Sequence, residues 1–316
     1  MIQCQTNADE GPIFLYMSNE DSTDDIPLLK DPSQSINILR RKIGHIPVNV
    51  AQTPYGNADS PFHGLIFVKP YVQPMVANDL IEILKQQTNI AYYMQSQDGN
   101  VTKEFRPLIG DIPLDLPFAQ KLLGDADAVN LWIGNSQTTS RLHNDNYENL
   151  FVQITGAKVI YLIPPGDAYA LDEKFLVSAT YVKDSSQFRI EIDSSQTVLP
   201  ADITPQALNA ALEQIDHLGP KVLFPTVDPS DPITHNHIFK QHAKVYRVQV
   251  EAGDVLYIPA LWYHQVEISD KEPISISVNY WYPADPASPI WSKSDYVRFT
   301  SAVLRGYHDD DFFADD

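Results

Sequence analysis

Short apolar runs separated by turn residues dominate the chain from residue 128 onward. Gly156, in the turn at 155–157, suits a type II′ hairpin that joins an apolar run at 149–154 to one at 158–165. Because strands and helices do not alternate regularly here, the pattern predicts an antiparallel barrel or jelly roll. The expected strands lie at 128–133, 149–154, 158–165, 245–250, 255–259, 263–268 and 274–282.

Helical periodicity precedes this region. Segments 35–43, 75–87 and 117–123 are predicted helices, and Asn78 is a candidate N-cap for the second. Strands are expected at 48–52 and 89–94. The chain therefore reaches the β region through a mixed segment whose helices would pack on the sheet.

Capping residues define two later helices. Thr204 and Pro205 begin a helix at 204–217. Ser288 and Pro289 begin a C-terminal helix that either lies on the barrel or joins two chains, and we favour a homodimer. The apolar side of this last helix consists of Tyr296, Phe299, Val303 and Leu304.

Three parts follow from this organisation. Residues 1–34 form a poorly defined acidic lead-in, and 35–286 form the main β domain. An insertion at about 166–243, with weak strands, interrupts that domain. Residues 287–316 hold the C-terminal helix and an acidic tail.

Composition limits the function classes. The 316 residues are 43% hydrophobic and carry a net charge of −19, from 22 basic and 41 acidic side chains. Such charge argues against direct nucleic-acid binding and favours cationic partners such as Lys- or Arg-bearing segments, unless it serves only solubility.

Cysteine usage and hydropathy indicate the compartment. Cys4 is the single cysteine, which excludes an internal disulfide and a thiolate zinc site and favours the cytoplasm or nucleus. No run approaches the roughly eighteen apolar residues of a membrane span, and the first thirty residues are polar, so neither a span nor a signal peptide is expected.

A candidate metal pair lies at His143 and Asp145. Their spacing of two places both side chains on one face of an extended strand, within reach of one ion. The same motif recurs at 308–310, but there it lies in the acidic tail without a strand pattern, and we interpret it as solvated charge. His235, His237 and His242 form a further histidine group in a loop-like setting without a matching acid, so exposed or substrate-facing histidines are the favoured interpretation.

His264 follows an apolar segment, where a histidine is usually a satisfied core residue. Combined with His143 and Asp145 in one barrel, it completes the two-His, one-carboxylate set expected for a non-haem Fe(II) oxygenase. Three octahedral positions would then stay open, two for a chelating 2-oxo acid and one for dioxygen.

Lys158 begins an otherwise apolar predicted strand. Its cation needs an anion or a route to water, and snorkelling at a hairpin end explains it equally well in isolation. With a dicarboxylic 2-oxo acid bound at the metal, Lys158 would pair with the far carboxylate. Neutral hydrogen bonds to such a ligand would come from Asn149, Asn279, Tyr93 and Ser140.

Several longer motifs resemble a known family. The segments HNDNYENLF (143–151), GAK leading into YLIPP (156–165), AGDVLYIPALWYH (252–264) and SVNYWY (277–282) resemble a Jumonji-C (JmjC) domain. The resemblance is most specific over 128–165 and 245–282 and weaker over 49–59 and 93–97. It is greatest to the Jumonji-C protein seven group of (3S)-lysyl hydroxylases, which are also described as peptidases.

The resemblance implies a fold and a site. The fold would be a double-stranded β-helix (a cupin-like jelly roll) with flanking helices. Fe(II) would be held by His143, Asp145 and His264, with O2 and 2-oxoglutarate as cosubstrates. The resemblance further assigns 2-oxoglutarate contacts to Lys158, Tyr93 and Ser140, with Asn149 and Asn279 at matching positions, although Ser140 replaces the family's usual Thr.

The resemblance also implies an activity: hydroxylation of a lysine side chain on a partner such as a developmentally regulated GTP-binding protein. Demethylation of a methylated Lys or Arg is the enzymatic alternative, and peptidase activity after methylated residues ranks lower because no general base is identifiable. A cupin-like binding scaffold without metal use is the non-enzymatic alternative.

Overall fold

The computed structural model describes residues 2–4, 15–17, 32–54, 57–58, 60–86, 88–96, 99–185, 187–193, 195–215, 218–231 and 237–307. Most of the lead-in, and the acidic tail after residue 307, lie outside these ranges. Within the lead-in, β1 (Ile2–Cys4) pairs with β2 (Leu15–Met17), and β2 pairs with the main sheet.

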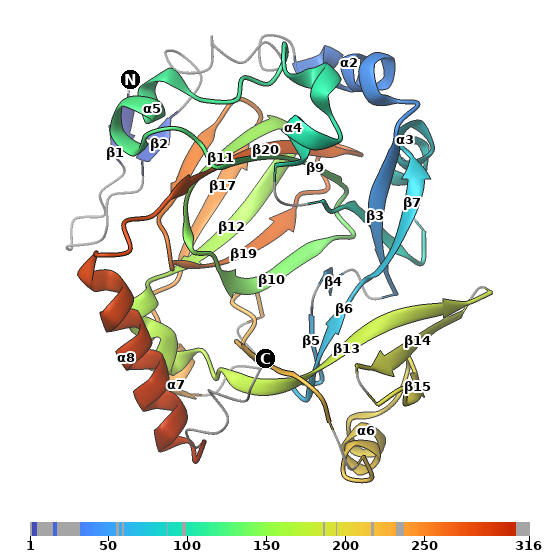
Figure 1. Ribbon diagram of the computed structural model, residues 1–316, viewed down its shortest axis with the longest axis vertical. Helices are drawn as coiled ribbons and strands as arrows, with labels where there is room; N and C mark the ends of the chain where they lie inside the picture. The colour runs from blue at the N-terminus through green and yellow to red at the C-terminus, as the bar shows by residue number, and fades with distance from the viewer. Residues whose placement is uncertain are drawn as a thin grey trace.

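Two facing sheets build the β domain (Figure 1). The nine-stranded sheet has the order β1-β2-β18-β11-β20-β9-β8-β3-β7, and the five-stranded sheet has the order β17-β12-β19-β10-β4. Except for the short parallel pair of β10 with β4, every pairing in these sheets is antiparallel, which confirms the predicted jelly roll. The strands that have not yet been bounded are β3 (Pro47–Thr53), β4 (Asn57–Ala58), β7 (Tyr71–Val76), β8 (Ala91–Met94), β9 (Ala128–Gly134), β10 (Thr139–Asn144), β11 (Tyr147–Thr155), β12 (Ala157–Ile163), β17 (Tyr246–Glu251), β18 (Val255–Ile258), β19 (Tyr263–Ile268) and β20 (Ser275–Pro283).

The predicted hairpin at 155–157 is wrong. β11 pairs with β18 and β20 in the large sheet, whereas β12 pairs with β17 and β19 in the small sheet. The turn is therefore a corner at which one long ribbon passes from sheet to sheet. Gly156 suits this corner because its φ is +72° and an added Cβ would lie 3.1 Å from the carbonyl oxygen of Ile274.

The other strand pairs repeat this arrangement. β17 and β18 lie in different sheets, as do β19 and β20, so the last predicted hairpin, between 263–268 and 274–282, is also a crossing. Turn residues mark where the chain changes direction, but they do not specify which sheet receives the next strand. From β9 to β12 and from β17 to β20, consecutive strands thus alternate between the two sheets, and this alternation of antiparallel strands forms the double-stranded β-helix.

Helices cover the outer face of the large sheet at one end of the molecule (Figure 1). They are α2 (Pro32–Ile43), α3 (Ala77–Leu84), α4 (Asn100–Lys103), the 3-10 turn η1 (Arg106–Leu108) and α5 (Pro117–Leu123). Buried side chains from these helices and from the sheet form one large apolar cluster, which includes Leu39, Leu80 and Leu131.

The helix at 75–87 is shorter than predicted. Residues 75 and 76 complete β7, and Val76 is the N-cap without a side-chain hydrogen bond, so the predicted Asn78 cap is wrong. Pairing of β7 with β3 overrides the helical pattern at this end.

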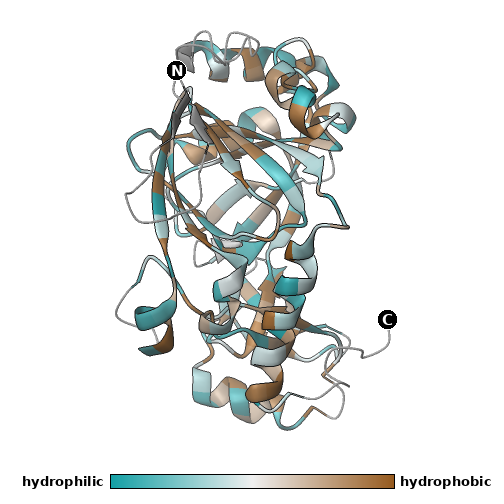
Figure 2. Cartoon of the chain, turned by 90° about the vertical axis from the view of Figure 1, so that its left-hand side faces the viewer, coloured by the Kyte–Doolittle hydropathy of each residue, from teal (hydrophilic) through white to brown (hydrophobic). Residues whose placement is uncertain are grey.

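The insertion builds a third sheet of order β15-β14-β13-β6-β5, with β16 also paired to β13. Its strands are β13 (Lys174–Asp184), β14 (Gln187–Ile192), β15 (Val198–Pro200) and β16 (Lys221–Phe224), joined by the earlier β5 (Ser60–Phe62) and β6 (Ile66–Lys69). These strands lie at the end of the molecule opposite the helices at 32–123 (Figure 1), and the side view shows the barrel between the two ends (Figure 2). The expectation of weak strands here is wrong, since β13 has 11 residues and a separate apolar cluster forms around it.

Caps in the later helices agree with the sequence. Thr204 accepts a hydrogen bond from Ala207 N, and Ser288 accepts one from Ile290 N. The first of these helices, α6 (Pro205–Leu212), ends earlier than predicted. The second, α8 (Pro289–Leu304), packs beside the 3-10 segment η2 (Pro165–Ala170) and α7 (His237–His242) (Figure 1).

The expected apolar side of α8 faces outward. Tyr296 is 70% exposed and Leu304 is 82% exposed, and Phe299 and Val303 are also exposed. The homodimer through this helix stays a prediction. No helix in the described ranges has the length and apolar character that crossing a membrane requires.

Candidate metal centre and its pocket

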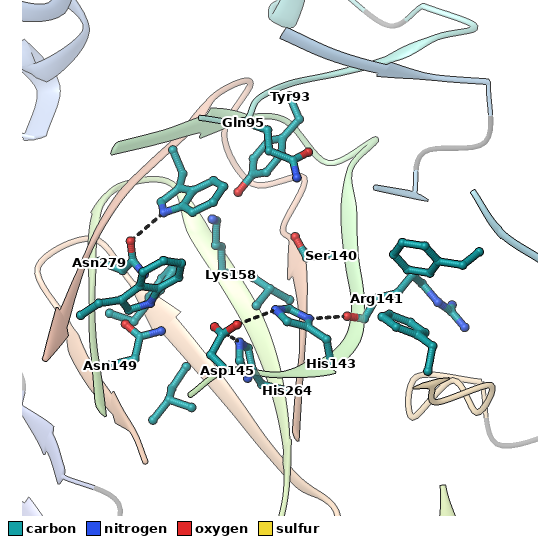
Figure 3. A pocket seen from close by; sticks show the side chains of 17 residues that line it. Tyr93, Gln95, Ser140, Arg141, His143, Asp145, Asn149, Lys158, His264 and Asn279 are labelled. Atoms are coloured by element: carbon teal, nitrogen blue, oxygen red, sulfur yellow. Dashed lines mark hydrogen bonds and ion pairs between the residues drawn. The ribbon is translucent and has the colours of Figure 1, made fainter. Parts of the chain in front are cut away.

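Pairing of β10 with β19 brings the candidate ligands together. His143 and His264 are direct cross-strand partners, and Asp145 follows β10 by one residue. One ligand atom from each of the three residues lies within 4.8 Å of the others. Asp145 Oδ2 is 3.5 Å from His264 Nε2, and Asp145 Oδ1 is 4.0 Å from His143 Nε2 (Figure 3).

Backbone carbonyls orient both imidazoles. His143 Nδ1 lies 2.7 Å from the carbonyl oxygen of Arg141, and His264 Nδ1 lies 3.1 Å from that of Trp262. With Nδ1–H donated to the backbone, each Nε2 is left as a lone-pair donor beside Asp145, the usual arrangement of metal-binding histidines. Burial lowers the pKa of His264 to about 4, with a smaller contribution from His143, which keeps His264 in the neutral form that binds a metal.

A tight turn holds the carboxylate-bearing residue in place. Leu261 donates its N–H to the carbonyl oxygen of Asp145 at 2.8 Å, and Leu261 itself has a φ of +66°. The turn closes through a 3.2 Å hydrogen bond from Trp262 N to Pro259 O. The segment before β19 therefore fixes Asp145 as well as leading into His264.

Lys158 is a buried cation facing the same cavity. Only 2% of it is exposed, so snorkelling to water is the wrong explanation for this residue. Its Nζ donates to Ser277 Oγ at 2.9 Å, and no carboxylate of the described residues forms an ion pair with it. Burial lowers its pKa to about 7. An anionic ligand would supply the missing charge partner.

An aromatic wall adjoins the lysine. Tyr93 hydrogen-bonds the Ser140 hydroxyl, and burial raises the pKa of Tyr93. Trp132 stacks on Tyr93 with ring centroids 5.7 Å apart and donates its indole N–H to Asn279 Oδ1 at 2.9 Å. A Cβ on Gly134 would lie 2.6 Å from the Tyr93 ring, so the absence of a side chain there makes room for the tyrosine.

Asn149 has a buried side-chain oxygen that accepts no hydrogen bond from the described residues. The residue as a whole is 4% exposed. The indole N–H of its cross-strand neighbour Trp281 likewise has no hydrogen-bond partner among the described residues. Buried polar groups without partners are rare, and here both line the cavity, which is consistent with contact to a ligand.

All eight sequence-predicted residues line one cavity of about 180 Å³ (Figure 3). They are Tyr93, Ser140, His143, Asp145, Asn149, Lys158, His264 and Asn279. Their individual roles toward metal and cosubstrate stay predictions. The cavity offers three ligands of the correct type for Fe(II) near a buried cation, so the residues present fit the metal and a dicarboxylic 2-oxo acid.

Sequence reasoning missed other lining residues. Arg141 and the adjacent Ser140 both line the cavity, where the pairing of β10 with β19 shifts register between Ser140 and His143, and no sequence signal indicates this irregularity. Phe67 and Phe224 come from the third sheet and contact each other with ring centroids 4.8 Å apart. No sequence signal places that sheet against the cavity.

The other histidine candidates form no comparable site in the described residues. His237 and His242 are exposed on α7, whereas His235 and the motif at 308–310 lie outside the described ranges. Within those ranges, the group of His143, Asp145 and His264 alone has the geometry of a metal site.

A cupin-type barrel with a His-Asp-His face and a buried lysine defines the oxygenase class of this fold. Comparison of the sequence with protein families agrees, since residues 20–288 match the model of the cupin-like domain. The chain belongs to this family and, within it, to the JmjC proteins.

Three relatives support the assignment. The human "Bifunctional peptidase and (3S)-lysyl hydroxylase JMJD7" is 30% identical over 252 residues, covering 78% of this chain and 71% of the relative. "JmjC domain-containing protein E" of Dictyostelium discoideum is 29% identical over 72% of this chain and 64% of its own length. "Lysine-specific demethylase JMJ32" of Arabidopsis thaliana is 27% identical over 81% of this chain and 71% of its own length.

Proposed function

We propose that the protein is an Fe(II)- and 2-oxoglutarate-dependent hydroxylase that acts on a lysine side chain of a partner protein. One observation carries the proposal: Lys158 is a buried cation without an anionic partner among the described residues, in the cavity that also holds the His143, Asp145 and His264 face. A dianionic 2-oxo acid could bind the metal ion through one carboxylate and pair with Lys158 through the other.

The protein's own residues would perform three tasks. His143, Asp145 and His264 would hold the ion on one face and leave its other side open to the cavity. Lys158, with the hydroxyl groups of Tyr93 and Ser140, would bind the far carboxylate of 2-oxoglutarate. A bound Fe(II) ion would supply the oxidative chemistry, in which 2-oxoglutarate and dioxygen yield succinate and carbon dioxide while one oxygen atom enters a substrate C–H bond.

Exclusion of water is the third task. Phe151 lies beneath the lysine, with its ring centroid 5.0 Å from Nζ, and Trp132 packs on Tyr93 on the adjoining side. These aromatic groups lower the local dielectric, which strengthens charge pairing with a bound cosubstrate.

The choice of a lysine substrate rests on charge and relatedness. A net charge of −19 favours cationic partners, and the human relative is named as a (3S)-lysyl hydroxylase. We infer a Lys-bearing segment of a GTP-binding protein as the partner, no direct nucleic-acid or membrane partner, and a cytoplasmic or nuclear location.

Demethylation of methylated lysine is the second candidate. The Arabidopsis relative is named as a lysine-specific demethylase, and the same oxidation of an N-methyl group gives an unstable product that loses the methyl. The two activities share every cavity residue named above. They differ only in which substrate carbon is presented to the metal.

Mass spectrometry separates these candidates. Lys-containing peptides of GTP-binding proteins, unmodified and N-methylated, are incubated with purified protein, Fe(II) and 2-oxoglutarate. A gain of one oxygen on lysine is the expected result. Loss of a methyl group would replace the proposal with demethylation, and shortened peptides would replace it with peptidase activity.

A matched variant tests the site itself. His143→Ala should abolish both peptide oxidation and succinate formation while the far-UV circular dichroism stays native, because it removes one ligand from a partly exposed position. Exposed His242 on α7 provides the control, and His242→Ala should retain activity. Equal activity of His143→Ala and wild type would reject the metal centre.

A further inference from the structure

A carboxylate of the insertion contacts both strands that carry the histidines. Asp228, in the segment after β16, forms an ion pair through Oδ2 with Arg141 of β10. Its Oδ1 accepts a hydrogen bond from Gln265 Nε2 of β19 at 2.8 Å. Ser230 also donates to Oδ1, from its backbone N–H at 2.9 Å and from its hydroxyl at 2.6 Å.

These contacts fall on an irregularity of the β10–β19 ladder. Ser140 pairs with Val266 and His143 pairs with His264, so two residues of β10 oppose the single residue Gln265 between these pairs. This is the geometry of a β-bulge, in which the extra residue is left unpaired and nearby side chains change direction. Arg141 is one of the two bulged residues.

The bulge bears directly on ligand orientation. The carbonyl oxygen that receives His143 Nδ1–H belongs to Arg141 (Figure 3), and Gln265 directly follows His264 in the sequence. A rotation of the backbone at the bulge would therefore turn the imidazole of His143 and alter its position opposite His264. Regular ladder pairing is interrupted at this step, so a side-chain contact that joins the two strands here would limit such a rotation.

Asp228 supplies that contact from outside the barrel. The side chains of Arg141 and Asp228 are only 14% and 22% exposed, and Gln265 is fully buried. Charge-assisted hydrogen bonds in such a setting are stronger and better defined than exposed ones. One carboxylate thus connects a bulged residue with the residue opposite it.

We propose that Asp228 is a positioning residue for the metal centre, which clamps the bulge and thereby keeps His143 and His264 in register. The insertion is then part of the metal site and not only a neighbour of it. This inference rests on the metal site of the proposed function, but not on the identity of any substrate.

The test compares two aspartates of the insertion. Asp193 is a close match for Asp228: its side chain is 21% exposed, and it accepts hydrogen bonds from one lysine and two hydroxyls, Lys69, Ser178 and Thr180. None of these partners belongs to β10 or β19. Asp228→Asn and Asp193→Asn change the net charge equally, and each removes one ion pair.

Mn(II) alone is the probe, with binding followed by electron paramagnetic resonance on protein shown to be folded by circular dichroism. We expect Asp228→Asn to weaken Mn(II) binding about tenfold, in line with the effect of groups that orient metal ligands, and Asp193→Asn to leave it unchanged. Both variants should lower the melting temperature, so loss of stability alone does not reproduce the difference.

Two further variants keep the inference testable if Asp228→Asn does not fold. Arg141→Lys retains the cation with altered geometry, and Arg141→Met removes it. Both should weaken Mn(II) binding, the lysine variant less. Where Asp228→Asn does fold, its combination with Arg141→Met should weaken binding no more than the worse single variant does. Native Mn(II) affinity in folded Asp228→Asn or in Arg141→Met would overturn the inference.

The outcomes separate the inference from the proposed function. Wild-type protein that binds Mn(II) but oxidises no lysine peptide would count against the proposed function. The role of Asp228 would then still be tested by the Mn(II) affinities of the variants. Wild-type protein that does not bind Mn(II) would overturn both.

Discussion

Replacement of Lys158 by methionine should stabilise the protein while destroying cosubstrate binding. Lys158 is 2% exposed, and burial lowers its pKa from 10.5 to about 7. At about 1.36 kcal/mol for each pKa unit, holding this ammonium inside the fold costs about 5 kcal/mol when it is charged in both states. Methionine has a similar length and carries no charge, so Lys158→Met removes this cost.

The stability advantage of Lys158→Met should depend on pH, because Lys158 loses its proton at a lower pH in the folded chain than in the unfolded chain. Below pH 7 both the folded and the unfolded chain hold the proton, and the full cost of about 5 kcal/mol is present. Between pH 7 and 10.5 only the unfolded chain holds it, so the wild-type free energy of unfolding rises with pH. The advantage of Lys158→Met should therefore shrink by about 3 kcal/mol between roughly pH 6 and pH 9.

Urea unfolding at these two pH values, without 2-oxoglutarate, measures the difference. Lys183 is the control, because it is only partly buried and donates to Gln52, and Lys183→Met should show no advantage that falls with pH. Addition of 2-oxoglutarate should raise the wild-type melting temperature and leave that of Lys158→Met unchanged. A Lys158→Met variant no more stable than wild type at pH 6 would refute the view that this cation lacks a charge partner.

Three other substitutions test separate features. Gly134→Ala places a Cβ 2.6 Å from the ring of Tyr93, so it should cost about 1–3 kcal/mol in urea unfolding and raise the KM for 2-oxoglutarate; an unchanged KM would contradict the role of Tyr93. Arg298→Met leaves the 5%-exposed Glu173 without its cation and should cost about 3–5 kcal/mol, again measured by urea unfolding, whereas a cost typical of surface pairs would show that the pair is solvated. The predicted homodimer through α8 should dissociate in Leu304→Asp, as measured by analytical ultracentrifugation, and wild-type protein that sediments as a monomer would reject it.

The candidate site was more predictable from sequence than the fold around it. His143 and Asp145 share a strand face because of their spacing, and Lys158 is conspicuous because its strand is otherwise apolar. These are local properties of short segments. His264 required the further assumption that its strand lies beside the first, and this rested on the antiparallel barrel that the strand pattern predicts.

Pairing between strands was the least predictable feature. The turn at 155–157 has hairpin chemistry, yet the two strands that it joins bond to different partners in different sheets. The choice depends on contacts with β17 to β20, far along the chain, which no local pattern encodes. The same limitation hid the third sheet, where β13 pairs with β6 from a distant segment.

Separation of the two histidines along the chain has a consequence for the order of folding. β10 and β19 are divided by the whole insertion, so their pairing closes a long loop and belongs to the slow, non-local steps of folding. A chain in which β19 has not yet been synthesised or has not yet paired with β10 would present His143 and Asp145 without His264 beside them. Such a chain would bind iron weakly. Bound metal would then stabilise mainly the fully folded barrel, so it would slow unfolding without accelerating folding.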